Sequence, residues 1–245
     1  MSIIISVLNG EKYIGDTIKS ILNQNYPNKE LIIIDGGSKD GTTDILKKYS
    51  SKIQWISEPD KGISDAFNKG IKLATGDFIN FQGDGDGFIH DNVLTEIFNN
   101  RVLKKDIIIC GNIIRIDNNG KKLFKTRLKG KFNKKSLLFK MSLPHQGLFM
   151  PMSFFDKYGL FDLKIKYAMD YELLLRAYKL FPEVVLINSP VAYWRADGLG
   201  EGKTIQILKE YLSIKKKNKV LNPIILSLIF VFDIAKFFLK SILKR

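Results

Sequence analysis

Short apolar runs alternate with segments of helical spacing along the first half of the chain. The apolar runs lie at residues 3–7, 31–34, 53–56 and 78–81. Between them, apolar residues recur every three or four positions, which predicts helices at 14–25, 45–49 and 66–74. Continuous apolar strands that alternate with helices are typical of a parallel sheet covered on both faces, so we expect an α/β fold.

The second half of the chain has a more mixed pattern. It predicts strands at 107–110, 112–116 and 184–187, and a helix at 171–181. Asn118-Asn119-Gly120 predicts a hairpin turn that leads into a strand at 123–127. There is no internal repeat and no long linker, so residues 1–203 are expected to form one domain.

Polar residues follow the predicted strands of the first half. They are Asn9, Asp35, Glu58 to Asp60, and Asp84 to Asp86. Ligands of open α/β sheets bind outside the carboxyl ends of the strands. The sequence therefore predicts a binding site at this edge of the sheet.

Asp84-Gly85-Asp86 is the strongest candidate for chemistry within that site. Carboxylates suit hard divalent cations, and Mg²⁺ or Mn²⁺ takes one or two of them together with substrate phosphates. The glycine lets the backbone approach a ligand closely. Taken alone the triplet also fits an ordinary turn, so its position after a buried strand is what favours a metal site.

Composition narrows the class of protein. Of the 245 residues 45% are apolar, which excludes a disordered chain. The single cysteine allows no internal disulfide and fits a reducing compartment. The apolar residues 1–7 have no basic leader and no small-residue cleavage site, so we interpret them as a strand and not as a signal peptide.

The formal charge of +14 is unevenly distributed. Residues 121–140 carry nine Lys or Arg and no acid, and residues 203–245 carry ten basic residues against Glu210 and Asp233. Such patches suit an anionic partner, which includes nucleic acid, a phosphorylated lipid and a membrane surface. The alternative for each single lysine is a solvated surface side chain.

The C-terminal residues 204–245 form a distinct basic tail. Residues 220–232 are uncharged, but a membrane-spanning helix needs about 20 apolar residues. The charged residues that follow share one helical face: Asp233, Lys236, Lys240 and Lys244. We therefore expect an amphipathic helix that lies peripherally on a membrane; the alternative is a helix packed on the protein's own core.

Several of these motifs, in this order, resemble family 2 glycosyltransferases with the GT-A fold, of the type that builds bacterial capsule, colanic acid or O-antigen. The resemblance covers roughly residues 2–194. The matching stretches are 3–9 with Tyr13, 34–42, 57–63, 65–70, 74–77, 84–86, 145–146 and 169–173. It implies a Rossmann-like, mostly parallel sheet flanked by helices.

The resemblance also implies a role for individual residues on the donor side. Asp86 would bind Mn²⁺ or Mg²⁺, with Asp84 assisting. Many family members have two adjacent acids where this chain has Asp35-Gly36, and an arginine where this chain has Phe67. The implied nucleotide-sugar contacts are Ser6, Leu8, Asn9, Asp35, Asp60, Asp65, Asn68, Asp84 and Gly85.

On the acceptor side, the resemblance makes Asp170 the general base and His145, Gln146 and Trp194 acceptor contacts. Without it, Asp170 would fit a helix N-cap. The implied reaction is inverting transfer from a nucleoside diphosphate sugar, taken as a UDP-sugar, to a hydroxyl of a glycan or lipid-linked acceptor. It would serve surface polysaccharide synthesis on the cytoplasmic face of the cell membrane.

Two other classes of protein remain as alternatives. One is a nucleotide-sugar-binding module without catalysis. The other is a nucleic-acid-binding protein, which the charge alone allows. Carboxylates at the strand ends would repel phosphate in the absence of a metal, so we expect no nucleic-acid partner.

Overall fold

A computed structural model describes residues 1–99, 106–196, 198 and 200–242, with side chains up to residue 239. The strands are β1 (Ser2–Val7), β2 (Glu30–Asp35), β3 (Gln54–Ser57), β4 (Phe78–Gly83), β5 (Gly87–Phe88), β6 (Ile108–Ile116), β7 (Lys122–Lys125), β8 (Leu148–Pro151) and β9 (Val184–Arg195). The helices are α1 (Ile14–Leu22), α2 (Thr42–Lys48), α3 (Ile63–Leu73), α4 (Val93–Phe98), α5 (Met152–Tyr158), α6 (Met169–Arg176), α7 (Thr204–Lys217) and α8 (Pro223–Ile242). Short 3-10 turns lie at Lys134–Leu138, His145–Gly147 and Tyr178–Leu180.

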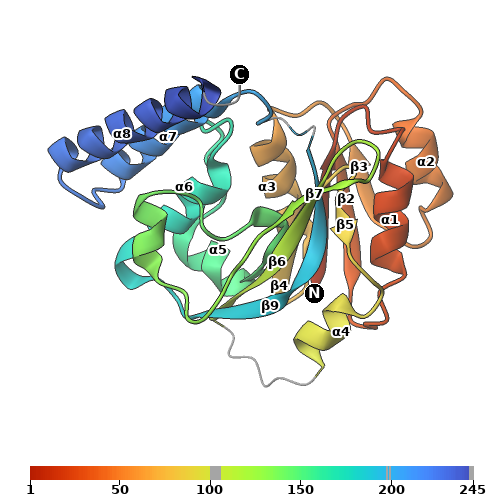
Figure 1. Cartoon of the computed structure of the whole chain (residues 1–245). Helices are drawn as coiled ribbons and strands as arrows, with labels where there is room; N and C mark the ends of the chain where they lie inside the picture. Colours follow the sequence, from red (N-terminus) through yellow and green to blue (C-terminus); the bar gives the residue numbers. More distant parts are fainter. Residues whose placement is uncertain (100–105, 197, 199, 243–245) are drawn as a thin grey trace.

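The described strands form a single sheet in the order β3-β2-β1-β4-β8-β6-β9-β5, with β7 paired to β6. Figure 1 shows this sheet with helices on both sides. Strands β1 to β4 are parallel to one another, as the strand-helix alternation predicts. Strand β8 joins the two halves because it pairs antiparallel with both β4 and β6. The predicted α/β class, a central sheet flanked by helices, is confirmed.

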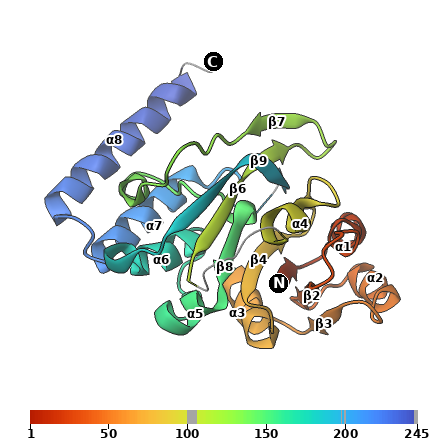
Figure 2. The ribbon, with the colours of Figure 1, turned by 90° about the horizontal axis from the view of Figure 1, so that it is seen from below.

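Alternate strand residues pack into two separate cores, because successive side chains point to opposite faces of a sheet. Ile4 and Ile32 pack with α3, α5 and α6 on one face. Ile3 and Ile33 pack with α1, α2 and α4 on the other (Figures 1 and 2). The carboxyl ends of β1 and β4 lie between these helical layers and carry the candidate site.

Predicted elements of the second half are present with different limits. The strands expected at 107–110 and 112–116 are one strand, β6, whose pairing with β9 is irregular around Gly111 and Asn112. The hairpin at 118–120 is confirmed, and Gly120 adopts a φ of 79° there. The helix expected at 171–181 is divided into α6 and a 3-10 turn.

The tail folds into α7 and α8, which pack against each other (Figure 1). The predicted C-terminal helix is therefore present. Asp233 is partly buried and Lys236 is exposed, whereas the Lys240 side chain and Lys244 lie outside the described residues. Within the described part of the chain, no helix combines the length and apolar character needed to cross a bilayer. The division between 1–203 and 204–245 stays a prediction.

A buried carboxylate ties α7 to α6. The side chain of Glu172 is fully buried and accepts a hydrogen bond of 2.8 Å from Arg176 Nε and one of 3.2 Å from Lys217 Nζ. Arg176 also donates to the carbonyls of Tyr158 and Leu160, so the cluster connects α5, α6 and α7.

We expect Glu172→Gln to lower the free energy of unfolding by about 2 to 3 kcal/mol, because a hydrogen bond to a charged group contributes about that much and a neutral amide leaves the cations poorly compensated. Thermal or urea unfolding measures this. The matched control is Glu96→Gln, which alters an exposed carboxylate 3.8 Å from His90 and should change stability little. Equal effects of the two substitutions would contradict the assignment.

Candidate active site

One cavity of about 1690 Å³ opens at the carboxyl edge of the sheet. Its walls come from the ends of β1, β4 and β9, the start of α3, the turn at 144–146, the start of α6, and α7. Nine of the residues predicted for the site line it: Ser6, Leu8, Asp60, Asp84, Asp86, His145, Gln146, Asp170 and Trp194. The fold therefore places residues that are far apart in the sequence around one cavity.

Asp86 lies three residues after the end of β4 and is held by three neighbours. Its Oδ2 accepts hydrogen bonds from Gly83 N and from Gln146 Nε2, both at 3.0 Å. Its Oδ1 accepts one from Arg195 N at 2.9 Å. Burial raises the pKa of Asp86 to about 6, although these donors oppose the shift. The carboxylate therefore joins β4, β9 and the 144–146 turn in addition to facing the cavity.

Asp84 and Gly85 form the turn between β4 and Asp86. The Asp84 carboxylate lies against the turn after β1, where a Cβ on Gly10 would stand 2.7 Å from Oδ2. Gly85 has a φ of 84°, and a Cβ there would lie 2.7 Å from Arg195 Nε. Glycine is therefore required at position 85 by both conformation and space.

The residues present fit a divalent cation bound jointly with a substrate. Asp86 Oδ1 accepts one hydrogen bond, which leaves it a second acceptor position. Among the described residues no cluster of three or more His, Cys, Asp or Glu side chains is arranged to hold a metal. A site with only Asp84 and Asp86 matches Mg²⁺ or Mn²⁺, which keeps most of its coordination for phosphates and water.

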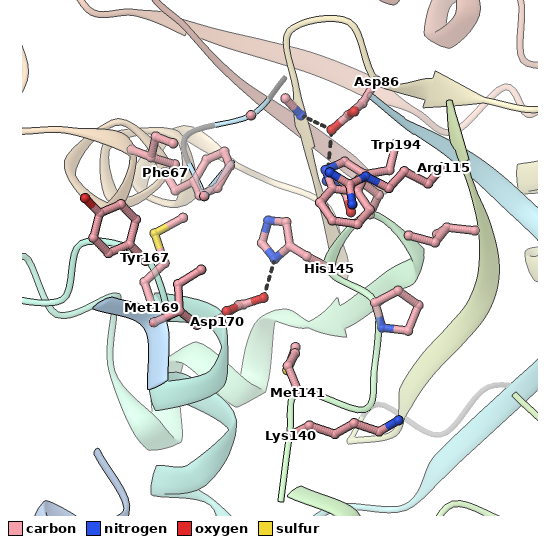
Figure 3. A pocket seen from close by; sticks show the side chains of 18 of the residues that line it. Phe67, Asp86, Arg115, Lys140, Met141, His145, Tyr167, Met169, Asp170 and Trp194 are labelled. Atoms are coloured by element: carbon pink, nitrogen blue, oxygen red, sulfur yellow. Dashed lines mark hydrogen bonds and ion pairs between the residues drawn. The ribbon is translucent and has the colours of Figure 1, made fainter. Parts of the chain in front are cut away.

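Asp170 occupies the first turn of α6 and faces His145 across the cavity wall (Figure 3). His145 Nδ1 lies 3.7 Å from Asp170 Oδ2, and the Asp170 side chain keeps 21% of its surface exposed. Burial raises the pKa of Asp170, and the charge of His145 opposes the rise. Burial lowers the pKa of His145, and Asp170 opposes that shift. A carboxylate with raised basicity at the cavity surface is suited to accept a proton.

The dipeptide His145-Gln146 connects the two carboxylates. His145 stacks against Phe67 and Phe81, with ring centroids 5.6 and 5.7 Å away. Its Nε2 is buried and has no hydrogen-bond partner among the described residues. Because adjacent residues contact Asp86 and Asp170, this single turn fixes both relative to each other.

Five predicted donor contacts do not line the cavity. Asp35 is fully buried and accepts hydrogen bonds from Ser38 N and from Ser57 Oγ. Asn68 exchanges two hydrogen bonds of 2.9 Å with the backbone of Phe161. The remaining three also bond within the protein: Asn9 with Lys39 N, Asp65 with Lys61 N, and Gly85 with Thr17 Oγ1. These contacts organise the loops around the cavity, and the donor roles of the five residues stay predictions.

Asp60 takes the place that a second acid after Asp35 would occupy. Its Oδ2 would lie 2.7 Å from a Cβ on Gly36, and its Oδ1 accepts a hydrogen bond from Gly62 N at 2.8 Å. The absence of a side chain at Gly36 thus leaves room for Asp60 at the cavity. This accounts structurally for the Asp-Gly sequence at 35–36.

The structure adds cavity residues that sequence reasoning did not assign. The Arg115 guanidinium lies over the Trp194 ring at 4.4 Å and pairs with Glu201 at 2.7 Å. Tyr211 lines the cavity from α7 and packs on Tyr171 with ring centroids 4.1 Å apart. A charged side chain in the mainly apolar strand β6 was a usable signal for Arg115. Tyr211 gave none, because the tail was expected to be separate from the site.

Comparisons with known proteins agree on one family. The family model for glycosyl transferase family 2 matches residues 2–159, which is more than half of the chain. A glycosyltransferase of Rickettsia prowazekii is 33% identical over 202 residues, covering 78% of this chain and 64% of that protein. A PGL/p-HBAD biosynthesis glycosyltransferase of Mycobacterium tuberculosis is 29% identical over 183 residues, covering 72% and 69%. The chain thus spans somewhat less than two thirds of the Rickettsia relative.

Solved structures show the same fold at low identity. TarS of S. aureus, residues 1–349 in complex with UDP, superposes with a TM-score of 0.69 at 17% identity, covering 95% of this chain and 70% of that one. The mannosyltransferase PcManGT from Pyrobaculum calidifontis, in complex with GDP-Man and Mn²⁺, gives a TM-score of 0.67 at 13% identity, covering 90% and 64%. The sheet, the cavity at its carboxyl edge and the matching family model lead to one conclusion: this chain belongs to glycosyl transferase family 2.

Proposed function

We propose that the chain is an inverting, metal-dependent hexosyltransferase that moves a sugar from a UDP-sugar onto a hydroxyl of a glycan or lipid-linked acceptor. One observation carries the proposal. Asp84 and Asp86 line the same cavity as Asp170. Figure 3 shows His145 between Asp86 and Asp170. Asp84 and Asp86 would bind the cation that holds the diphosphate. Asp170 would remove the proton from the acceptor hydroxyl.

Neighbours of the same fold support the choice of donor and metal. TarS structures hold UDP and UDP-GlcNAc, and the PcManGT structure holds GDP-Man and Mn²⁺. In this chain Ser6, Leu8 and Asp60 line the side of the cavity formed by β1 and the start of α3, which suits the nucleoside. Bound Mn²⁺ or Mg²⁺ would neutralise negative charge on the leaving diphosphate.

The residues of the chain supply the remaining steps. Asp170 removes the proton of the acceptor hydroxyl, and that oxygen forms a bond to the anomeric carbon. The bond from the same carbon to the nucleoside diphosphate breaks with its electron pair, so one displacement inverts the configuration. Gln146 and Arg195 N hold Asp86 in a fixed orientation during this exchange.

The acceptor side of the cavity is strongly basic. Its lining includes these cationic residues: Arg127, Lys129, Lys131, Lys140, Lys164 and Lys166. Such a wall favours an acceptor with phosphate groups, as a lipid-linked glycan has. We therefore place the reaction in surface polysaccharide synthesis at the cytoplasmic face of the membrane, with peripheral contact through the tail. Asp86 and Asp170 inside the same cavity disfavour a nucleic-acid ligand.

Purified protein with a panel of nucleotide sugars, with and without Mn²⁺, tests the proposal. A ligand at a concentration of about 100 times its dissociation constant stabilises the folded protein by about 2.7 kcal/mol. This raises the unfolding temperature of a domain of this size by several degrees. We expect this for a UDP-sugar only with Mn²⁺, together with release of UDP when acceptor is added. Stabilisation without any UDP release would favour a binding module without catalysis. No stabilisation by any nucleotide sugar would contradict the proposal.

A further inference from the structure

Helix α8 turns an apolar face to the outside of the molecule. At about 100° per residue, the exposed positions between 224 and 239 fall within one half of the circumference of the helix. The large apolar side chains on that half are Ile224, Ile225, Leu228, Val231, Phe232, Phe238 and Leu239. Figure 2 shows α8 as an outer element that projects from the body of the protein. Surface helices of soluble domains normally present polar residues on this side.

The inward half of α8 is also apolar, and it holds the acid. Leu226 is buried, and Phe230 and Phe237 are partly buried. Asp233 lies on this inward half: burial lowers the pKa of Lys215 on α7, and the charge of Asp233 opposes that shift. A helix that is apolar on both sides and directs its only described acid inward is suited to an apolar environment outside.

The other acid of the tail also faces the domain. Glu210 on α7 accepts hydrogen bonds from the backbone N–H groups of Lys166, Tyr167 and Ala168, at 2.8 to 2.9 Å. Lys217 pairs with Asp162 and Glu172 of the domain. The other exposed charged residues on the described tail are all basic: Lys209, Lys216, Lys219 and Lys236. Lys236 borders the apolar half of α8. The outer surface of the tail therefore combines apolar and cationic groups without a free acid.

We infer that the outward face of α8 docks on a lipid bilayer that carries anionic headgroups, with the helix axis along the surface. Charge selects this occupant: anionic lipid attracts the lysines of the tail, whereas a second copy of a chain with a net charge of +14 is repelled. Lys236 can extend its ammonium group to the headgroups while its stem stays with the apolar side chains. This docking deepens the proposed peripheral contact, but it does not depend on the transfer reaction.

Docking through α8 also brings the cavity close to the bilayer. Helix α7 packs against α8 and contributes Thr204, Ile207 and Tyr211 to the cavity wall. An acceptor whose lipid portion stays in the membrane would therefore meet the cavity next to α7. This step, unlike the docking itself, rests on the proposed function.

Vesicle flotation of the full chain at physiological salt tests the docking. One set of vesicles is phosphatidylcholine alone, and the other contains about a third phosphatidylglycerol, since each basic residue near an anionic surface adds affinity. The test protein carries Leu228→Ser and Leu239→Ser, which are 65% and 61% exposed. The control carries Leu123→Ser and Leu180→Ser, which are 51% and 73% exposed and lie outside the tail.

We expect the wild-type protein to bind the anionic vesicles. Its affinity should fall at least about tenfold for vesicles without phosphatidylglycerol. The affinity of the test protein for anionic vesicles should also be at least about tenfold lower, whereas the control should bind like the wild type. In Phe232→Trp, the emission of the introduced tryptophan should shift to shorter wavelength when anionic vesicles are added. This shift would show that the apolar face of α8 inserts into the bilayer. Absence of wild-type binding, equal loss in test and control, or concentration-dependent dimerisation through Leu228 and Leu239 would overturn the inference. Calorimetry should give the same affinity for the UDP-sugar in the wild type, the test protein and the control. Absence of UDP-sugar binding in all three would count against the proposed function and not against the docking.

Discussion

Replacement of Asp170 by asparagine is expected to lower the rate constant of sugar transfer by about 100- to 10 000-fold, the usual contribution of a general base. Asparagine has the same shape but cannot accept the proton of the acceptor hydroxyl. The affinity for the UDP-sugar should stay unchanged, because Asp84 and Asp86 hold the diphosphate side of the cavity. Single-turnover kinetics with saturating donor measures the rate, and calorimetry measures donor binding.

The pH profile adds a second test of this role. Burial raises the pKa of Asp170, so the carboxylate is protonated over more of the acidic range than an exposed aspartate. With saturating Mn²⁺, transfer by the wild type should therefore fall as the pH decreases through that raised pKa, and the residual rate of Asp170→Asn under the same conditions should lack this limb. Asp156→Asn, the same change at an exposed position on α5, serves as the control. Full activity of Asp170→Asn would show that another group accepts the proton.

Asp86→Asn is expected to reduce kcat/KM by about 100-fold or more. Charge neutralisation by a divalent cation is worth several kcal/mol in the transition state, and each 1.36 kcal/mol is a factor of ten. Mn²⁺-dependent binding of the UDP-sugar should weaken as well, which calorimetry detects without turnover. Asp84→Asn should have a smaller effect, and Asp91→Asn, an exposed control, should have none. An Asp86→Asn protein that keeps wild-type Mn²⁺-dependent binding would contradict the ligand assignment.

The raised pKa of Asp86 gives this prediction a pH signature. Only the ionised carboxylate binds a cation, so Mn²⁺ affinity should fall about tenfold per pH unit below about 6, whereas an ordinary carboxyl of pKa 3.8 would protect binding to much lower pH. In the metal-free protein the folded state binds more protons than the unfolded state between these values. Asp86 therefore contributes a decrease in stability as the pH rises from about 4 to 6. Asp86→Asn should remove this contribution, so the stability of the variant relative to the wild type should rise with pH over this range. Thermal unfolding measures the difference and also shows whether the variant folds.

The first half of the fold could be predicted because its pattern is local and repeated. Apolar runs such as 31–34 form strands buried on both faces, and Ile14, Ile18 and Ile21 recur at helical spacing on α1. The second half depends on pairing between distant segments. Strand β8 is four residues long, ends in Pro151 and pairs with β4 at only two positions, so no local pattern indicated it.

Site residues that follow a strand could be predicted from their position in the sequence. Contacts that side chains make with distant segments could not. Asp86 and Asp60 reach the cavity from the carboxyl edge of the sheet, as their positions predict. Asp35 also ends a strand, but the hydroxyl groups of Ser38 and Ser57 turn its carboxylate into a buried acceptor. Ser38 lies in the loop after β2, whereas Ser57 is the last residue of β3 and pairs in register with Asp35. The sequence around either serine alone does not reveal the contact.

The hydrogen bonds between Glu210 and the backbone of residues 166–168 tie α7 to the domain, whereas α8 makes no such hydrogen bond to the domain among the described residues. The tail can therefore be cut between α7 and α8, a position that its composition does not indicate. Glu210 accepts hydrogen bonds from the backbone just before Asp170, and Tyr211 lines the cavity, so α7 is part of the domain that carries the candidate site. Shortening the chain before α7 would therefore remove part of the wall of the candidate site. Shortening it after Lys219 would keep the contacts of Glu210 and remove α8 with the short segment before it, so the proposed transfer reaction could be measured apart from the proposed membrane contact.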